Sequence, residues 1–304
     1  MNTLIINLGP PGDVLRTTVL LRELNDDIYW LSSKKCKDVL NSNRIKKIFF
    51  IEDRSDNEEF KEYFFDLVIS LNEQKEALDF LDKLNYKKLI GVYKEGEKIK
   101  YTPESAYWFD MSLVSKFGKE KADELKWKNK KPYPQILIEM IGKEWKGQEY
   151  DLGIDLEKSK EKEMKGRIGL INTVTGLWPN KGWNGYEKLA EILKKDHYEV
   201  VFLGMRPSIK EHIEDIEKCE LIVCGDTLGM HIALALKKKV VALFNCTSPS
   251  EIYDYGRLIK IVSPLLKEYF YKKEYSRKAI EAIKVDSVLD AIKKFLNDQL
   301  LSEK

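Results

Sequence analysis

The sequence predicts an α/β protein with two Rossmann-like domains, each built on a parallel sheet. In the first half, short runs rich in β-branched residues, such as 3–8, alternate with segments whose apolar residues have helical spacing. A second alternation of the same kind begins after Gly166, and a charged, irregular stretch separates the two series. Strands that alternate with helices favour right-handed crossovers and parallel sheets. We therefore expect two such domains that face each other across a cleft.

The first series indicates one domain over residues 1–150. Its expected strands are 3–8, 28–31, 48–51, 65–71 and 88–92, and its expected helices are 13–24, 73–84 and 104–125. Residues 126–166 contain the charged stretches KWKNKKPYPQ and LEKSKEKEMKG. This composition is typical of a connection between domains.

The second series indicates another domain over residues 166–285, followed by a C-terminal helix over 286–304. Its expected strands are 168–172, 200–203, 221–224 and 240–244, and its expected helices are 186–195, 208–218 and 230–236. The segment 285–300 has the spacing of an amphipathic helix. In doubly wound sheets, ligands bind beyond the carboxyl ends of the strands, and the unusual motifs of this chain follow strands.

Composition and charge exclude several classes of protein. The net charge of +2 over 304 residues gives no global field that would attract nucleic acid or a membrane. The sequence has no run of about 18 uncharged apolar residues, which a membrane span needs, and Asp13 and Arg16 interrupt the apolar N-terminus. Its four cysteines form no CxxC pair, so we expect a reduced, cytoplasmic protein.

A local basic segment, residues 34–47, contains six lysines and arginines and one aspartate. A solvated surface explains such a segment as an ordinary property of a charged protein. It also suits contact with an acidic glycan acceptor or with the inner membrane surface, and the sequence leaves these interpretations open.

The loop GPPGDVLRTT, residues 9–18, follows the first expected strand. Gly9 and Gly12 allow backbone angles that other residues avoid, and they let a substrate approach the main chain. The loop lacks the GK[ST] of a P-loop and the GxGxxG spacing of a dinucleotide site. Asp13 is either a cap of the following helix or a general base. The two roles are compatible, because a helix N-terminus keeps a carboxylate ionised.

The segment GDTLGMHIALAL, residues 225–236, runs from a strand directly into an apolar helix. The backbone N–H groups of Thr227, Leu228 and Gly229 suit an anion at the helix N-terminus. Asp226 precedes them and could accept hydrogen bonds from sugar hydroxyls. His231 either contacts a phosphate or satisfies a buried hydrogen bond.

The segment NTVTGLWPNKGWNGYEKLAEIL, residues 172–193, follows the first strand of the second series. Thr173 and Thr175 offer hydroxyl groups, and Lys181 is a candidate ligand of a diphosphate, because a lysine neutralises phosphate as a mobile point charge. Trp178 and Trp183 either shape the loop or stack on a ring.

No group of histidine, cysteine, aspartate and glutamate residues has the spacing of a metal site. The three histidines, at 197, 212 and 231, are scattered. We therefore expect no metal and no tightly bound cofactor. The residues together indicate transfer of a group from a phosphate-bearing donor that the second domain binds.

These motifs resemble those of glycosyltransferase family 9, the ADP-heptose:lipopolysaccharide heptosyltransferases. GDVLRTTVLLREL resembles the family's N-terminal motif, and CGDTLGMHIALALKKKVVALFNCTSP resembles its D-[ST]-G-x-x-H-x-A-A-A-L segment with the turn after the next strand. NKGWNGYEKLAEIL and IKVDSVLDAIKKFL resemble its K-x-W stretch and its C-terminal helix. The matches occur in order and span residues 3–300.

The resemblance implies a GT-B fold and a metal-independent, inverting transfer from a nucleotide-diphosphate sugar, typically ADP-heptose, to a glycan or glycolipid such as lipopolysaccharide core. It implies that Asp13 is the general base. It further implies that the donor is bound by Lys181, Asp226, Thr227 and Gly229, with Thr173 and Thr175 in the phosphate loop.

The chain also departs from the family's pattern. The usual D-T-G is replaced by Asp226-Thr227-Leu228-Gly229, and no glycine-rich turn precedes the acidic residue that holds the ribose, for which Glu211 is the nearest candidate. The chain is also shorter than many relatives, which indicates a trimmed first domain. Two alternatives stay open: a GT-B transferase with another donor, such as a UDP-hexose, and a catalytically silent nucleotide-sugar-binding protein.

Overall fold

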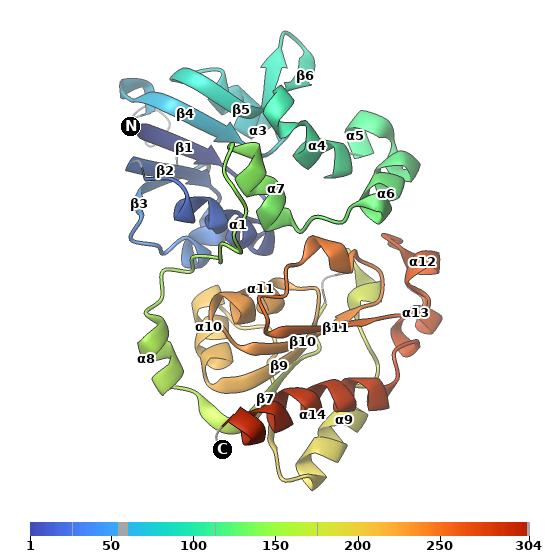
Figure 1. Ribbon diagram of the computed structural model, residues 1–304. Helices are drawn as coiled ribbons and strands as arrows, with labels where there is room; N and C mark the ends of the chain where they lie inside the picture. Colours follow the sequence, from blue (N-terminus) through green and yellow to red (C-terminus); the bar gives the residue numbers. More distant parts are fainter. Residues whose placement is uncertain (26, 54–59, 113, 175, 303–304) are drawn as a thin grey trace. The chain divides into compact units, whose positions relative to one another are not determined.

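The computed structural model describes residues 1–25, 27–53, 60–112, 114–174 and 176–302. The chain forms two compact units, Met1–Ile154 and Asp155–Lys304 (Figure 1). The sequence pattern places the first domain at 1–150 and a connection up to about residue 166. In the structure most of that connection belongs to the units themselves, because it contains two short helices and the start of a strand.

The first unit is built on a six-stranded sheet with the order β3-β2-β1-β4-β5-β6. The strands are β1 (Asn2–Ile6), β2 (Asp27–Ser32), β3 (Ile45–Phe50), β4 (Phe64–Ser70), β5 (Asn85–Glu95) and β6 (Lys98–Tyr101). The first five are parallel, as expected, whereas β6 pairs antiparallel with β5. β1 lies at the centre of the sheet, and Leu4, Ile5 and Ile6 are fully buried there.

The helix expected over 13–24 begins earlier and changes its geometry part of the way along. α1 (Pro11–Thr17) starts at a proline and continues as a 3-10 helix, η1 (Thr18–Arg22). The hydroxyl groups of Thr17 and Thr18 donate to the carbonyls of Val14 and Leu15, at 2.6 and 2.7 Å. Such back-bonding by threonine competes with regular helical hydrogen bonds, which accounts for the change at residue 18.

The other regular elements of the first unit are helices. The elements are η2 (Lys34–Val39), η3 (Phe60–Glu62), α3 (Lys75–Leu81), η4 (Pro103–Ser105), α4 (Ala106–Ser112), α5 (Val114–Phe117), α6 (Lys119–Lys128) and α7 (Tyr133–Met140). α7 lies within the stretch interpreted as a connection. It is instead a buried helix of this unit that packs on α1, because Tyr133, Ile136 and Leu137 supply an apolar face.

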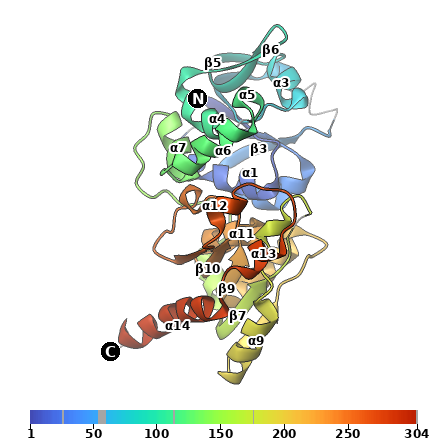
Figure 2. The ribbon, with the colours of Figure 1, turned by 90° about the vertical axis from the view of Figure 1, so that its right-hand side faces the viewer.

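The second unit has a five-stranded parallel sheet with the order β11-β10-β9-β7-β8, of which β10, β9 and β7 are labelled in Figure 2. Its strands are β7 (Met164–Ile171), β8 (Glu199–Phe202), β9 (Cys219–Gly225), β10 (Lys239–Phe244) and β11 (Leu258–Val262). Its helices are α8 (Leu156–Glu161), η5 (Pro179–Lys181), α9 (Tyr186–Lys195), α10 (Ile209–Glu217), α11 (Leu228–Ala235), η6 (Pro249–Glu251), α12 (Leu266–Tyr269), α13 (Arg277–Glu281) and α14 (Val285–Ser302).

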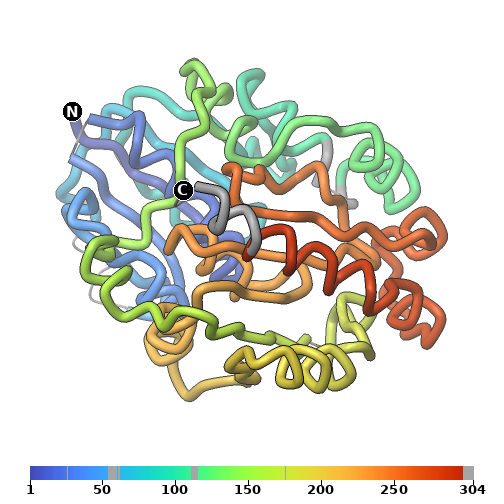
Figure 3. Tube along the Cα trace, turned by 60° about the horizontal axis from the view of Figure 1, so that its bottom comes forward, coloured from blue at the N-terminus to red at the C-terminus, as the bar shows by residue number. Residues whose placement is uncertain are grey.

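The C-terminal helix α14 belongs to the second unit. Val288 and Ile292 are fully buried and join a core that includes Leu170 of β7 and Val241 of β10. The helix runs beside α9, which covers the same sheet (Figure 3). Among the helices of the described residues, none combines the length and the apolar character that crossing a membrane requires.

Candidate functional site

The strand order creates one switch point in each sheet. In the first sheet the direction of winding reverses between β1 and β4, and in the second it reverses between β7 and β9. Ligands of doubly wound folds bind outside the carboxyl ends of strands at such points. The loop at 9–18 follows β1, the segment at 172–181 follows β7, and Asp226 follows β9. The three motifs singled out in the sequence thus lie at the two switch points.

In the first unit, side chains hold the loop that follows β1. The Asn7 amide donates to the hydroxyl of Thr17 at 3.2 Å, and its oxygen accepts from the Gly9 N–H at 3.0 Å. The N–H of Leu8 donates to the side chain of Asn72, after β4. Gly9 and Gly12 do not have the positive φ angles that the sequence suggested. Space around Gly9 is tight instead, since a Cβ there would lie 3.0 Å from the Asn7 side-chain oxygen, which accepts from the Gly9 N–H.

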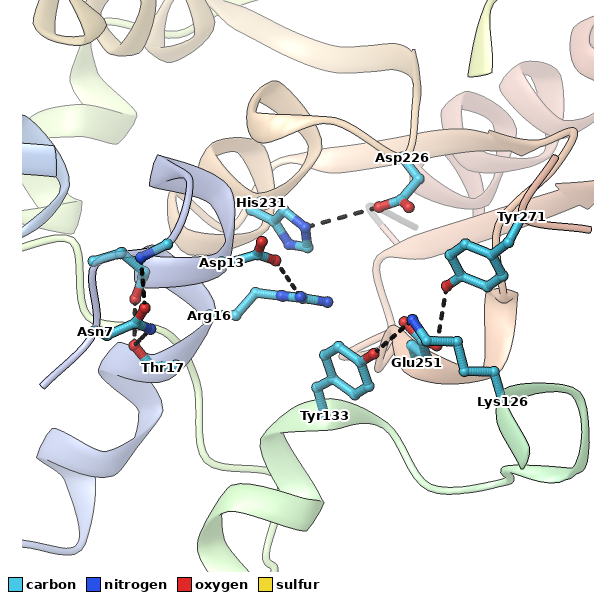
Figure 4. A network of polar contacts seen from close by, with 12 residues as sticks. Asn7, Asp13, Arg16, Thr17, Lys126, Tyr133, Asp226, His231, Glu251 and Tyr271 are labelled. Carbon is cyan, nitrogen blue, oxygen red and sulfur yellow. Dashed lines mark hydrogen bonds and ion pairs between the residues drawn. The ribbon is translucent and has the colours of Figure 1, made fainter. Parts of the chain in front are cut away.

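Asp13 lies in the first turn of α1, but it does not cap the helix. The N-cap is Pro10, and no side chain makes a capping hydrogen bond there. The Asp13 carboxylate, 49% exposed, pairs with the guanidinium of Arg16, whose side chain is 11% exposed. The carbon of that guanidinium lies 4.3 Å from the centre of the Tyr133 ring (Figure 4). The interpretation as a cap is therefore wrong, because the proline start moves the cap three residues upstream.

In the second unit, Lys181, Asp226 and His231 lie together. The Lys181 ammonium donates to the Asp226 backbone carbonyl at 2.7 Å and to its carboxylate at 3.1 Å. The other carboxylate oxygen lies 3.8 Å from Nε2 of His231 (Figure 4). All three side chains are at most 20% exposed. Their charges are therefore less screened by water than those of a surface pair.

Thr227 is the N-cap residue of α11, and Gly229 lies in the first turn of that helix. The Thr227 hydroxyl makes no capping bond, and it has no hydrogen-bond partner within the described ranges. A side chain at Gly229 would collide with Ile171 and come within 3.1 Å of Nε2 of His212. The start of α11 therefore presents backbone N–H groups and a threonine hydroxyl beside Lys181, which suits an anion.

The remaining predicted donor residues are less organised. Thr173 lies in the irregular segment after β7, and Thr175 lies outside the described residues. Ser208 is the N-cap of α10: its hydroxyl accepts from the Glu211 N–H at 3.2 Å and donates to the Glu211 carboxylate at 3.0 Å. These contacts give Glu211 a structural role, and the ribose contact stays a prediction.

Two asparagines that the sequence analysis missed support Lys181. Asn180 is fully buried; its amide donates to the carbonyls of Lys272 and Glu274, and its oxygen accepts from the N–H of Ser276. Asn245, just after β10, donates to the carbonyl of Gly182 at 2.7 Å. A polar residue directly after a strand was the available signal for Asn245, whereas nothing local marks Asn180.

The two tryptophans of this segment differ. Trp183 is part of the core, and its indole N–H donates to the carbonyl of Ile283 at 2.9 Å. Trp178 is half-buried and meets the edge of the Tyr271 ring. The packing interpretation therefore applies to both. Tyr271 in turn donates its hydroxyl to the buried Glu251 at 3.0 Å (Figure 4).

Within the described residues, no three histidine, cysteine, aspartate or glutamate side chains are arranged to hold a metal ion. All four cysteines are free and buried. Burial raises the pKa of Cys219 to about 11 and that of Cys246 to about 12, so both are protonated at neutral pH. The charged groups at the switch points are thus a carboxylate–guanidinium pair in the first unit and an ammonium–carboxylate pair at a helix start in the second.

Comparisons with known proteins find one matching family model and several similar structures. The family described as glycosyltransferase family 9 (heptosyltransferase) matches residues 205–280, which include Asp226 and His231. The glycosyl transferase family 9 protein from Veillonella parvula DSM 2008 has a similar structure, with a TM-score of 0.68 and 15% identity over 98% of this chain and 97% of its own. No curated protein matches the sequence.

Two structures of E. coli enzymes are similar over the same length. The ADP-heptose lps heptosyltransferase II has a TM-score of 0.67 and 15% identity, with 98% of this chain and 99% of that chain covered. The heptosyltransferase WaaC, solved with ADP-2-deoxy-2-fluoro heptose, has a TM-score of 0.62 and 12% identity, with 98% and 100% covered. The expected fold class, two Rossmann-like domains of the GT-B type, is confirmed.

Proposed function

With the chain taken as a glycosyltransferase of the family 9 kind, we propose that it transfers a heptose or a related sugar from an ADP-sugar to a hydroxyl group of a cell-surface glycan such as lipopolysaccharide core. The observation that carries this proposal is the group formed by Lys181, Asp226 and the start of α11. It joins a cation, a carboxylate and free N–H groups, which are the ligands of a diphosphate that bears a sugar.

The second unit binds the donor in this proposal. Lys181 and the N–H groups of Thr227 and Gly229 neutralise the diphosphate, with His231 and the hydroxyls of Thr173 and Thr175 as further contacts. Asp226 accepts hydrogen bonds from the hydroxyl groups of the sugar. Glu211 is assigned to the ribose. Since the Asp226 carboxylate already orients the Lys181 ammonium, the cation is placed before the donor arrives.

The first unit supplies the general base. Asp13 takes the proton of the acceptor hydroxyl, whose oxygen forms a bond to the anomeric carbon of the donor sugar while the bond from that carbon to the diphosphate breaks. The nucleoside diphosphate leaves with the electron pair, and its charge is stabilised by Lys181 and α11. A single displacement of this kind inverts the configuration at the anomeric carbon.

The proposal involves no metal and no cofactor, because Lys181 and the helix start carry the charge compensation that a divalent cation would otherwise provide.

It places the protein in the cytoplasm, where nucleotide sugars are available, with a glycan or glycolipid acceptor and a peripheral contact with the inner membrane surface. The basic segment 34–47 is not assigned to either partner. Two of its charges already have partners within the first unit: Lys46 pairs with Asp27 at 2.6 Å, and Arg44 donates to the carbonyl of Leu21 at 3.0 Å.

Calorimetric titration with ADP, UDP and GDP tests the donor assignment. ADP should bind most tightly, with unchanged affinity when EDTA is present. Lys181→Met should weaken binding by about 10- to 100-fold, since a hydrogen bond to a charged group contributes about 1.5–3 kcal/mol. The exposed Lys188 on the second unit provides the matched control, Lys188→Met, which should bind as the wild type does.

The outcomes distinguish the alternatives. Preference for UDP would support a transferase with another donor, such as a UDP-hexose. Tight nucleotide binding without donor hydrolysis or transfer to any acceptor would support a catalytically silent binding protein. Unchanged affinity in Lys181→Met would remove this residue from the diphosphate site.

A further inference from the structure

Arg16, the side chain that pairs with Asp13, is held by two contacts within the first unit. Arg16 contacts the carboxylate of Asp13 through Nη2, and its guanidinium lies over the ring of Tyr133 at 4.3 Å (Figure 4). Only 11% of the Arg16 side chain is exposed. A long charged side chain rarely adopts such a buried position without partners, because desolvation of the charge is costly. Arg16 is therefore fixed in one arrangement.

Tyr133 is itself anchored. It is the first residue of α7, it is 5% exposed, and its ring lies 5.1 Å from that of Trp108. Its hydroxyl accepts a hydrogen bond from the Lys126 ammonium at 3.3 Å. Stacking of an arginine on an aromatic face stabilises the cation and fixes the plane of the guanidinium. The orientation of Arg16 is thus set by a residue 117 positions away in the sequence, as read from the residue numbers.

The arrangement acts on an otherwise weakly held carboxylate. Asp13 makes no capping bond, its side chain is 49% exposed, and α1 is only seven residues long. A carboxylate in that position would sample several rotamers in water. The ion pair with the guanidinium of Arg16 restricts the Asp13 carboxylate to one of these rotamers.

Other titratable groups lie on α1 and on the elements packed against it. They are Arg22 on η1, Lys34, Lys35, Cys36, Lys37 and Asp38 on η2, and Tyr133 and Glu139 on α7. Within the part of the chain that the structure describes, Arg16 is the cation that forms an ion pair with Asp13.

We propose that Arg16, held by Tyr133, is a positioning residue for the general base: it holds the Asp13 carboxylate in one orientation until the acceptor hydroxyl arrives. This inference rests on the proposed function. In this role the charge of Arg16 holds the carboxylate, and its planar shape, stacked on Tyr133, sets the direction of that contact and thereby the rate at saturating substrate.

The test compares kcat and KM of Arg16→Met and Arg16→Lys. In Arg16→Met kcat should fall roughly 100-fold, because a catalytic group displaced by about 1 Å loses about that much in rate. In Arg16→Lys the charge is kept, and kcat should fall less, about tenfold, through loss of the stacked, planar contact. The Kd for ADP should not change in either variant.

Two further variants complete the experiment. Tyr133→Leu removes the ring and should lower kcat in the same direction as Arg16→Lys, and Tyr133→Phe, which keeps the ring, should have a smaller effect. Arg44→Met is the matched control, because Arg44 pairs with a different aspartate of the first unit, Asp151. It should leave kcat unchanged. If Arg16→Met does not fold, Tyr133→Leu and Arg16→Lys still report on the orientation of the guanidinium.

A normal kcat in a folded Arg16→Met variant, as judged by circular dichroism, overturns the proposal. So does a normal kcat in both Arg16→Lys and Tyr133→Leu. Failure of the proposed function gives a different result, since Asp13→Asn would then retain turnover. Loss of turnover in Asp13→Asn together with a wild-type kcat in the Arg16 variants leaves Asp13 as the base and removes the role of Arg16.

Discussion

The candidate sites of the two units are built in different ways. In the second unit, Lys181 and Asp226 contact each other twice, and the surrounding loops are tied together by the buried Asn180 and Asn245. In the first unit, Asp13 lies on a helix of seven residues with half of its side chain exposed, and its partner among the described residues is Arg16. The charged side chains of the second site are at most 20% exposed, whereas the Asp13 side chain is 49% exposed.

This difference follows the chemistry proposed for each site. A diphosphate carries a large charge that must be bound before and during bond breaking, so donors of hydrogen bonds placed in advance are favourable. A base must instead exchange its partners when the acceptor arrives, and an exposed carboxylate with one ion pair can do so. The comparison predicts that substitutions at the site of the first unit lower turnover, whereas substitutions at the site of the second unit weaken donor binding.

The largest effect is expected for Asp13→Asn. Removal of a general base typically costs about 10²–10⁴ in rate, so turnover should fall by at least that range. The substitution preserves shape, and the Kd for ADP measured by calorimetry should stay within a factor of two of the wild type, where a factor of two is about 0.4 kcal/mol. Near-normal turnover would remove Asp13 from the mechanism and with it the contrast between the two sites.

An intermediate effect is expected for Asn180→Ala. The substitution removes three hydrogen bonds from a fully buried side chain to residues 272–276 and leaves backbone groups without partners, which costs about 1–3 kcal/mol. The melting temperature should fall by several degrees, and ADP should bind more weakly because the adjacent Lys181 loses its fixed position. Thermal unfolding with and without ADP measures both effects.

Asn184→Ala is the control for this variant. Asn184 lies in the same segment, but its amide binds the Glu281 carboxylate at the exposed surface. Surface contacts of this kind contribute little. A fall in stability for Asn184→Ala as large as that for Asn180→Ala would show that the segment is merely intolerant of change.

The smallest effect concerns the thiols next to the two sites. Cys36 donates to the carbonyl of Gly9 at 3.5 Å, and Cys246 follows Asn245. Burial raises the pKa of both, and that of Cys246 to about 12, which leaves about one thiolate in ten thousand at pH 8. Iodoacetamide labelling followed by mass spectrometry should modify Cys36 faster than Cys246. Faster labelling of Cys246 would contradict the view that the second site is the more closed one.

Much of the fold could be predicted from local patterns. The strands of both sheets that carry the motifs are close to their expected positions, because runs of buried β-branched residues such as those around Ile5 and Val223 have few alternatives. The expectation failed at α7, which was interpreted as part of a connection. The apolar face of α7 is buried by packing on α1. These two helices lie far apart in the sequence, so a local pattern does not predict their contact.

The sequence by itself determined which chemical groups follow which strands. Asp13 after β1, Lys181 after β7 and Asp226 after β9 could be identified as candidates, because glycine-rich turns and charged residues at strand ends are visible locally. The tertiary structure decided their partners. Arg16 and Tyr133 come together through the packing of α7 on α1, and Asn180 reaches residues 272–276 through a loop more than 90 positions later. Such contacts depend on how helices and loops pack across a sheet, which no local pattern specifies.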